Sequence, residues 1–199
     1  MTNLPSFQYF YKSGSKQLDV VLPGFDAGIK LPLMQEVIAL SKEKGHSVLS
    51  FDYLFFERGD EKSSGMELPE ERQTLEDLLN FVQAEQFDHI CLIGKSLGGI
   101  TASFFLRDLP DEEKKRYSLI ILGCVKESVD LTAFPGRVVI VQGGADKHGD
   151  IEAVKNLYIG KTSAKVEYYG ISGASHGFSD PETKEPKYYN QVIELLKKL

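Results

Sequence analysis

The chain has 199 residues, 42% hydrophobic and 26% charged, which is the composition of an ordinary globular protein. That length can bury a core without disulfides or metals, and we expect one domain over residues 1–199. Its 29 acidic residues outnumber the 23 basic ones, so the net charge is −6. This balance argues against a nucleic-acid partner, because Lys and Arg must neutralise phosphates in such complexes.

The sequence shows no targeting or membrane signal. The first residues have no basic segment leading into an apolar run, and no apolar run approaches the roughly 18 to 20 residues that span a bilayer. The two cysteines, Cys91 and Cys124, lie in apolar stretches and are expected to be buried thiols. We therefore expect a cytoplasmic protein, and with only two cysteines neither a disulfide scaffold nor a four-ligand zinc site is expected.

Short β-rich runs alternate with longer stretches of helical period. Strands are predicted at residues 7–11, 18–22, 47–52, 89–93, 118–123, 138–142 and 166–169, and helices at 31–44, 70–86, 97–109, 151–158 and 187–199. Continuous apolar strands are typical of a parallel sheet covered by helices on both faces. The pattern predicts an α/β fold, with a doubly wound, mostly parallel sheet of about six to seven strands. We expect the first two strands to form an antiparallel hairpin at one edge.

This topology restricts where a ligand can bind. In open parallel sheets, ligands bind beyond the carboxyl ends of the strands. His46 and His89 precede predicted strands and fall on the opposite edge, whereas His148 and His176 follow strands. The last two are therefore the histidines to consider for chemistry.

Residues 94–98 read Gly-Lys-Ser-Leu-Gly and connect a predicted strand to a predicted helix. A serine on such a sharp turn is presented for attack, and the flanking glycines let strand and helix approach each other. The backbone N–H of Leu97 and the helix N-terminus then face the developing oxyanion. We predict Ser96 as a nucleophile and Leu97 as one oxyanion donor. The alternative is a structural turn in which Ser96 only caps the helix.

A nucleophilic serine needs a base. In chains with this turn, the order is nucleophile, acid, histidine. His176 lies in a loop of small residues, Gly-Ala-Ser-His-Gly-Phe at 173–178, and follows the last predicted strand. It is therefore the predicted base. His148 has no plausible acid between itself and His176, so we expect it at the rim of the site.

The base needs a carboxylate that orients it. Asp146 follows the strand at 138–142 directly, in the segment Gln-Gly-Gly-Ala-Asp, and is the first candidate. Asp150, four residues further on, and Asp130, which follows the preceding strand, stay open as alternatives.

A second oxyanion donor is expected from the loop that follows the strand at 18–22. This loop begins Pro-Gly-Phe-Asp-Ala-Gly at 23–28. Gly24 lets the backbone come close to the serine, and the N–H of Phe25 is the predicted donor. A simple strand-to-helix turn, which glycine and aspartate also favour, is the alternative.

Together, the segments around Ser96, Asp146 and His176 resemble the α/β-hydrolase superfamily over nearly the whole chain. The segment Gly-Lys-Ser-Leu-Gly-Gly at 94–99 is most similar to small lidless members near the dienelactone-hydrolase and acyl-thioesterase branches. The resemblance implies cleavage of a carboxylic ester or thioester through an acyl-enzyme, without a cofactor. One departure is the oxyanion loop, which opens with Pro23-Gly24 where many relatives have His-Gly.

Spacing also predicts the surroundings of the site. Few residues separate the strand ending near 123 from the next one at 137, so no cap domain fits between them. Residues 53–69 are either a flap facing the substrate or an ordinary loop. Lys95 and Lys147 are expected near the site, where they would favour an anionic substrate.

The sequence therefore predicts a serine hydrolase of a small-molecule ester or thioester. Two alternatives stay open. One is a catalytically idle hydrolase-like domain that binds a partner protein, and the other is an amide or peptide hydrolase, which the same residues support.

Overall fold

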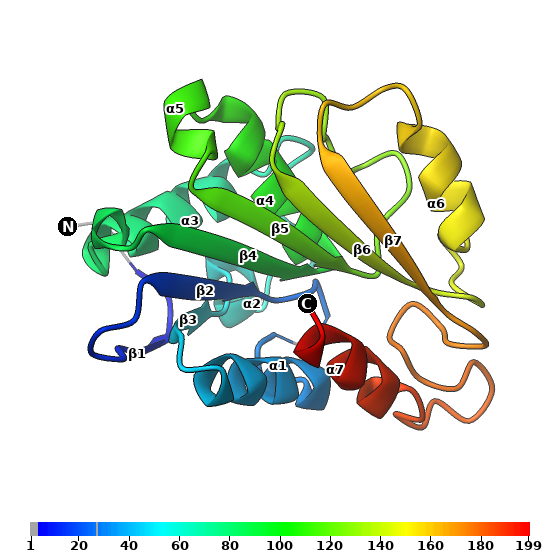
Figure 1. The fold of residues 1–199 in the computed structure, drawn as a ribbon. Helices are drawn as coiled ribbons and strands as arrows, with labels where there is room; N and C mark the ends of the chain where they lie inside the picture. Colours follow the sequence, from blue (N-terminus) through cyan, green and yellow to red (C-terminus); the bar gives the residue numbers. More distant parts are fainter. Residues whose placement is uncertain (1–3, 27) are drawn as a thin grey trace.

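The computed structural model describes residues 4–26 and 28–199. In this part of the chain, one seven-stranded sheet has the order β1-β3-β2-β4-β5-β6-β7, and only the β1–β3 pair is antiparallel (Figure 1). The strands are β1 (Phe7–Phe10), β2 (Gln17–Leu22), β3 (Ser47–Phe51), β4 (His89–Lys95), β5 (Tyr117–Leu122), β6 (Arg137–Gly143) and β7 (Lys165–Ile171). The predicted doubly wound, mostly parallel sheet is confirmed.

Helices cover both faces of this sheet and bury two hydrophobic clusters. They are α1 (Pro32–Glu43), α2 (Leu54–Arg58), α3 (Pro69–Phe81), α4 (Leu97–Asp108), α5 (Asp111–Lys114), α6 (Ile151–Tyr158) and α7 (Tyr189–Lys197), with a 3₁₀ turn at Ala84–Gln86. Helices α1 and α7 pack on one face, and α3, α4 and α6 on the other (Figure 1). The apolar, nearly continuous burial of β2 to β6 follows from this double cover.

The predicted hairpin between the first two strands is wrong. Strand β1 pairs with β3, and β3 separates it from β2. The reason lies in their burial: β2 is buried along almost its whole length and pairs in parallel with both β3 and β4. Strand β1 alternates between half-buried and exposed residues, a pattern that suits the edge of a sheet.

The predicted flap at 53–69 divides into two parts. Its first aromatic residues, Tyr53 and Phe55, are buried in the core at the start of α2, and Tyr53 donates a hydrogen bond to Thr101 of α4. Gly59 ends α2 in the left-handed conformation. Only the segment that follows, up to Leu68, is a loop at the surface.

The carboxyl ends of the parallel strands meet at the right-hand side of Figure 1. Residues 123–136, between β5 and β6, contain no helix or strand, so no cap domain covers this edge, as predicted. Within residues 4–26 and 28–199, no helix combines the length and apolar character needed to cross a membrane.

Candidate active site

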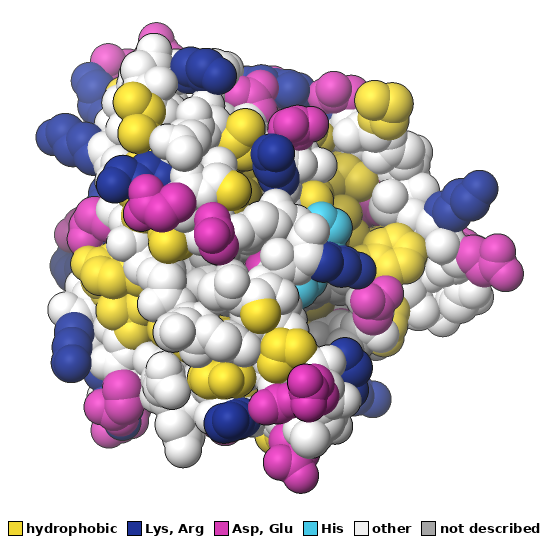
Figure 2. Space-filling view, turned by 90° about the vertical axis from the view of Figure 1, so that its right-hand side faces the viewer, with side chains coloured by type: hydrophobic (Ala, Val, Ile, Leu, Met, Phe, Trp, Pro, Cys, Tyr) yellow, Lys and Arg dark blue, Asp and Glu magenta, His cyan; other side chains and the backbone are white. Residues whose placement is uncertain are grey.

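Figure 2 looks onto the carboxyl edge of the sheet, where histidine side chains lie in a hollow bordered by hydrophobic residues. The topology brings the loops after β2, β4, β6 and β7 to this edge. Ser96, Asp146, His176 and the segment containing Phe25 belong to these four loops. His46 precedes β3 and His89 begins β4, so both lie at the opposite edge of the sheet. There, His46 forms a hydrogen bond with Asp19, and His89 forms one with Ser118.

Ser96 lies on a strained turn between β4 and α4. Its backbone has φ +51° and ψ −110°, a conformation that L residues rarely adopt. The turn is possible only because glycines stand two residues before and two residues after Ser96. A Cβ on Gly94 would lie 2.4 Å from the backbone of Gly98 and Gly99, and one on Gly98 would lie 2.4 Å from the carbonyl oxygen of Leu22. The close approach of helix and strand therefore accounts for the glycine spacing of the motif.

A chain of hydrogen bonds runs from Ser96 to a buried carboxylate. The Nε2 atom of His176 lies 2.9 Å from Oγ of Ser96, and its Nδ1 atom lies 2.7 Å from Oδ2 of Asp146. A carboxylate accepts hydrogen bonds, so we assign the proton of the neutral ring to Nδ1. Nε2 is then free to accept the hydroxyl proton of Ser96. This arrangement activates a serine for nucleophilic attack.

The side chain of Asp146 is fully buried, and every contact holds its carboxylate toward His176. Oδ2 also accepts from Nε2 of Gln142 at 2.9 Å, and Oδ1 accepts from the backbone N–H of His148 at 2.8 Å. Gln142 in turn accepts from the N–H of Cys124 at 2.7 Å, which ties the ends of β5 and β6 together. Sequence reasoning missed Gln142, although a polar residue ending the apolar strand Val-Val-Ile-Val was a signal.

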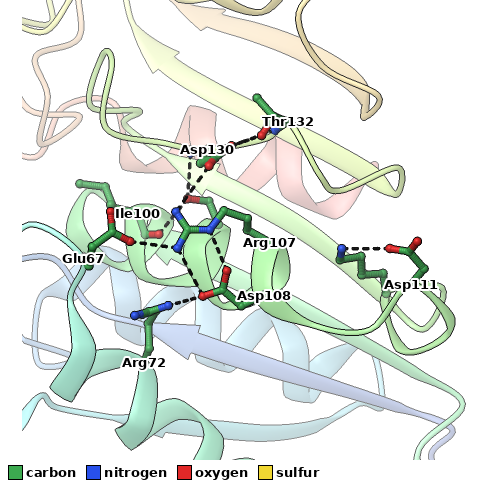
Figure 3. A network of polar contacts seen from close by, with 10 residues as sticks. Glu67, Arg72, Ile100, Arg107, Asp108, Asp111, Asp130 and Thr132 are labelled. Atoms are coloured by element: carbon green, nitrogen blue, oxygen red, sulfur yellow. Dashed lines mark hydrogen bonds and ion pairs between the residues drawn. The ribbon is translucent and has the colours of Figure 1, made fainter.

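The structure places the two alternative acids elsewhere. Asp130 lies over α4, where Thr132 donates to it and the Arg107 guanidinium lies 3.6 Å away (Figure 3). Asp150 is exposed and caps the N-terminus of α6 by accepting from the N–H of Ala153 at 2.9 Å. Neither carboxylate bonds to His176, whereas Asp146 does.

His148 lies closer to His176 than a rim position implies. The two imidazole rings pack edge to face with their centroids 4.8 Å apart. Burial and the neighbouring His176 lower the pKa of His148, which favours its neutral form at pH 7. Among the described residues, Asp146, His148 and His176 form a group whose possible metal-ligand atoms lie within 4.8 Å of one another. Two of these residues already share a hydrogen bond, so their atoms are arranged to hold a proton.

The loop after β2 passes directly beside Ser96. A Cβ on Gly24 would lie 3.8 Å from Cβ of Ser96 and 3.6 Å from the carbonyl oxygen of Lys95. Among the described residues, the backbone N–H groups of Phe25 and Leu97 have no protein acceptor. The Phe25 ring stacks on Phe55 with centroids 5.3 Å apart, which anchors the loop. Two unpaired backbone donors beside a serine hydroxyl are the arrangement that an oxyanion hole requires.

Asp52 holds the far end of this loop and was missed by sequence reasoning. It is buried, and its Oδ1 accepts from the backbone N–H of Ile29 at 2.7 Å. Burial raises the pKa of Asp52. Gly28 has φ +58°, and a Cβ there would lie 2.4 Å from Oδ1 of Asp52. An aspartate at the carboxyl end of a buried strand was the signal available in the sequence.

Lys95 differs from the expectation of an exposed cation beside the substrate. It is only 4% exposed, and its Nζ atom faces the ring of Phe178, 5.9 Å away, beneath the His176 loop. Burial lowers the pKa of Lys95 to about 8. Lys147, by contrast, is exposed. Of the two lysines expected near the site, Lys95 is therefore packed against the loop of His176, and only Lys147 is exposed.

Comparisons with known proteins identify the family and the fold. The family model described as an alpha/beta hydrolase domain matches residues 20–198. Among solved structures, an alpha-beta serine hydrolase homologue from Coxiella burnetii is similar over 100% of this chain and 97% of its own, with 21% identity and a TM-score of 0.77. No curated protein matches the sequence.

Two further structures show the same fold. Dienelactone hydrolase from Anabaena variabilis is similar over 96% of this chain and 88% of its own, with 14% identity and a TM-score of 0.74. A serine hydrolase without a lid from Xanthomonas campestris is similar over 96% of this chain and 86% of its own, with 16% identity and a TM-score of 0.70.

Proposed function

This chain belongs to the alpha/beta hydrolase family, and we propose that it is a serine hydrolase that cleaves a carboxylic ester or thioester. The observation that carries the proposal is the chain of hydrogen bonds from Ser96 through His176 to Asp146, at 2.9 and 2.7 Å. Its placement on a strained glycine-flanked turn, beside two unpaired backbone donors, supports the same chemistry.

In the acylation step, Oγ of Ser96 attacks the substrate carbonyl carbon while Nε2 of His176 takes the hydroxyl proton. Asp146 keeps the other ring proton on Nδ1 and stabilises the imidazolium that forms. The N–H groups of Phe25 and Leu97 hold the negative oxygen of the tetrahedral intermediate. Collapse of this intermediate breaks the bond to the alcohol or thiol, which leaves with the proton from His176.

The second half of the reaction reverses these roles with water. His176 removes a proton from a water molecule, whose oxygen attacks the acyl-enzyme carbonyl. The second tetrahedral intermediate releases the carboxylic acid and returns the proton to Ser96. The residues of this chain supply every proton transfer in the cycle.

A fluorophosphonate probe tests the proposal, because it reacts only with an activated serine. We expect stoichiometric labelling of the full-length protein, with the modified peptide containing Ser96, and loss of labelling in Ser96→Ala. The matched control is Ser103→Ala, a serine of α4 whose hydroxyl donates to the Ile100 carbonyl. A protein that is folded but resists the probe and hydrolyses no ester contradicts the proposal, and would instead fit an idle domain.

A further inference from the structure

A groove of about 700 Å³ runs along α4, the helix that starts directly after the proposed nucleophile. Its floor is one face of α4, because Leu97, Ile100, Phe104 and Arg107 recur at helical spacing along it. One wall comes from residues 63–68 and the other from residues 127–132, with α6 contributing at the far side. Leu97, which directly follows Ser96 in the chain, lines the groove, so we take the end at Leu97 as the end nearest the proposed nucleophile.

The apolar side chains of the groove dominate its lining. They include Leu97, Ile100, Phe104, Leu131, Leu157 and Met66, of which Met66 is 95% exposed at the surface. An exposed, unbranched methionine next to a groove is suited to packing against a flexible apolar ligand. These side chains can bury hydrocarbon, and the charged residues Glu127 and Lys161 also line the groove outside the Arg107 network.

The far end of the groove is held in shape by Arg107 (Figure 3). Its guanidinium donates to Glu67 at 2.9 Å and to Asp108 at 2.8 Å, and lies 3.6 Å from Asp130. Glu67 belongs to one wall and Asp130 to the other, so a single side chain of the floor joins both walls. With three carboxylates around it, Arg107 has no charge left for an anionic ligand.

The position of His176 decides which part of a substrate enters the groove. The loop of His176 packs through Ala174 and Phe178 into the cluster on the α1–α7 face of the sheet. The groove residues Leu97 and Phe104 belong to the cluster on the α4 face. His176 must give its proton to the leaving group, so the leaving group lies on the α7 side of Ser96. The acyl group then faces the α4 side, where the groove begins.

Resting on the proposed function, we infer that this groove binds the acyl chain of the substrate, and that the preferred chain is linear, uncharged and about eight carbons long. The length follows from α4. Leu97 and Phe104 are seven residues apart, or about 10 Å at ~1.5 Å per residue. An extended chain advances ~1.2 Å per bond, as an extended peptide does, so about eight carbons reach Phe104.

The test measures kcat/KM for p-nitrophenyl esters of straight-chain acids from acetyl to dodecanoyl. We expect kcat/KM to rise about two- to fourfold per methylene up to about eight carbons and then to level off; about fourfold corresponds to complete burial of each methylene. A second series of acetyl esters, with alcohols of increasing length, is expected to show no such rise. A rise that follows the alcohol chain, or a flat acyl series, overturns the inference.

Substitution of the floor tests the location. In Ile100→Trp the indole fills the groove, and the octanoyl-to-acetyl ratio of kcat/KM is expected to fall at least about tenfold. Ile193→Trp is the matched control, since Ile193 is a half-buried isoleucine of α7 on the opposite face, and it should leave the ratio unchanged. If Ile100→Trp does not fold, Leu157→Trp blocks the groove from α6.

Fluorophosphonate labelling separates this inference from the proposed function. Variants that are labelled at Ser96 but keep the wild-type octanoyl-to-acetyl ratio overturn the acyl groove and leave the serine hydrolase intact. Absence of labelling in the wild-type protein overturns both.

Discussion

The two sides of Ser96 differ in the polarity of their side chains. Behind His176, Asp146 and Gln142 are buried polar groups with hydrogen-bond partners around them. On the α4 side, the groove is lined by apolar side chains, and three of its charged residues, Glu67, Arg107 and Asp130, form a network at the far end. The polar side controls the proton transfers through His176, whereas the apolar side controls which acyl chains of the substrate can bind.

This difference predicts two kinds of mutational effect. A change on the polar side should lower the rate for every substrate, because each one uses the same proton transfers. A change on the apolar side should alter the ranking of substrates, because only long chains reach the altered residues. Measurements of variants on both sides with the same ester series therefore distinguish the two kinds of effect.

The largest effect is expected for Ser96→Ala. Removal of the nucleophile should lower kcat by about 10⁶-fold for short and long esters alike, because no other group forms the acyl-enzyme. The measurement is steady-state hydrolysis of acetyl and octanoyl p-nitrophenyl esters, with circular dichroism as the check on folding. A variant that keeps most of its activity rules out Ser96 as the nucleophile.

Asp146→Asn should lower kcat by about 10⁴-fold. An asparagine amide that donates to Nδ1 of His176 moves the ring proton to Nε2, which can then no longer accept from Ser96. The loss should be equal for acetyl and octanoyl esters. Asp150→Asn is the control, because Asp150 only caps α6 and asparagine caps equally well. Equal losses in both variants would show that the carboxylate of Asp146 does not orient the base.

Sequence reasoning reached the serine and the histidine, because each has a local signal. The glycine spacing around Ser96 and the small-residue loop around His176 are both visible in one segment of chain. For the acid, sequence reasoning placed Asp146 first and left Asp130 and Asp150 open, because all three follow strands. Their placement depends on distant partners, such as the Arg107 side chain that lies beside Asp130.

Features that join distant segments were the ones that the sequence did not reveal. The pairing of β1 with β3 depends on which edge of the sheet is free. The groove collects side chains from α4, α6 and two loops, so no periodic pattern marks it. Lys95 is a charged residue at the end of an apolar strand, where the sequence gives no sign of its burial. Only the packing of Phe178 against it shows that it is buried.

Lys95→Met tests how much the buried charge of Lys95 lowers the stability of the folded protein. Burial lowers the pKa of Lys95 from 10.5 to about 8, so the unfolded chain binds more protons between these values. The buried charge therefore destabilises the folded state below about pH 8, and this penalty fades as the pH rises toward 10.5. We expect Lys95→Met to raise the free energy of unfolding at pH 7 by about 3 kcal/mol.

Urea denaturation at pH 7 and pH 10 measures this effect. The gain in Lys95→Met should fall to about 1 kcal/mol at the higher pH, whereas Lys147→Met, which removes an exposed lysine, should change little at either pH. A gain of the same size at both pH values would mean that packing, and not the buried charge, is responsible.

The smallest effect is expected at the far end of the groove, where Arg107→Met removes the guanidinium but keeps an unbranched side chain. Without it, Glu67 and Asp130 repel each other and the two walls separate at the end of α4. The dodecanoyl-to-octanoyl ratio of kcat/KM should then rise about threefold, because longer chains gain buried length beyond Phe104. Arg72→Met is the control, since Arg72 pairs with Asp108 and touches neither wall through that contact. An unchanged ratio in Arg107→Met would mean that Arg107 does not form the end of the groove. The limit on the length of the acyl chain would then lie at other residues.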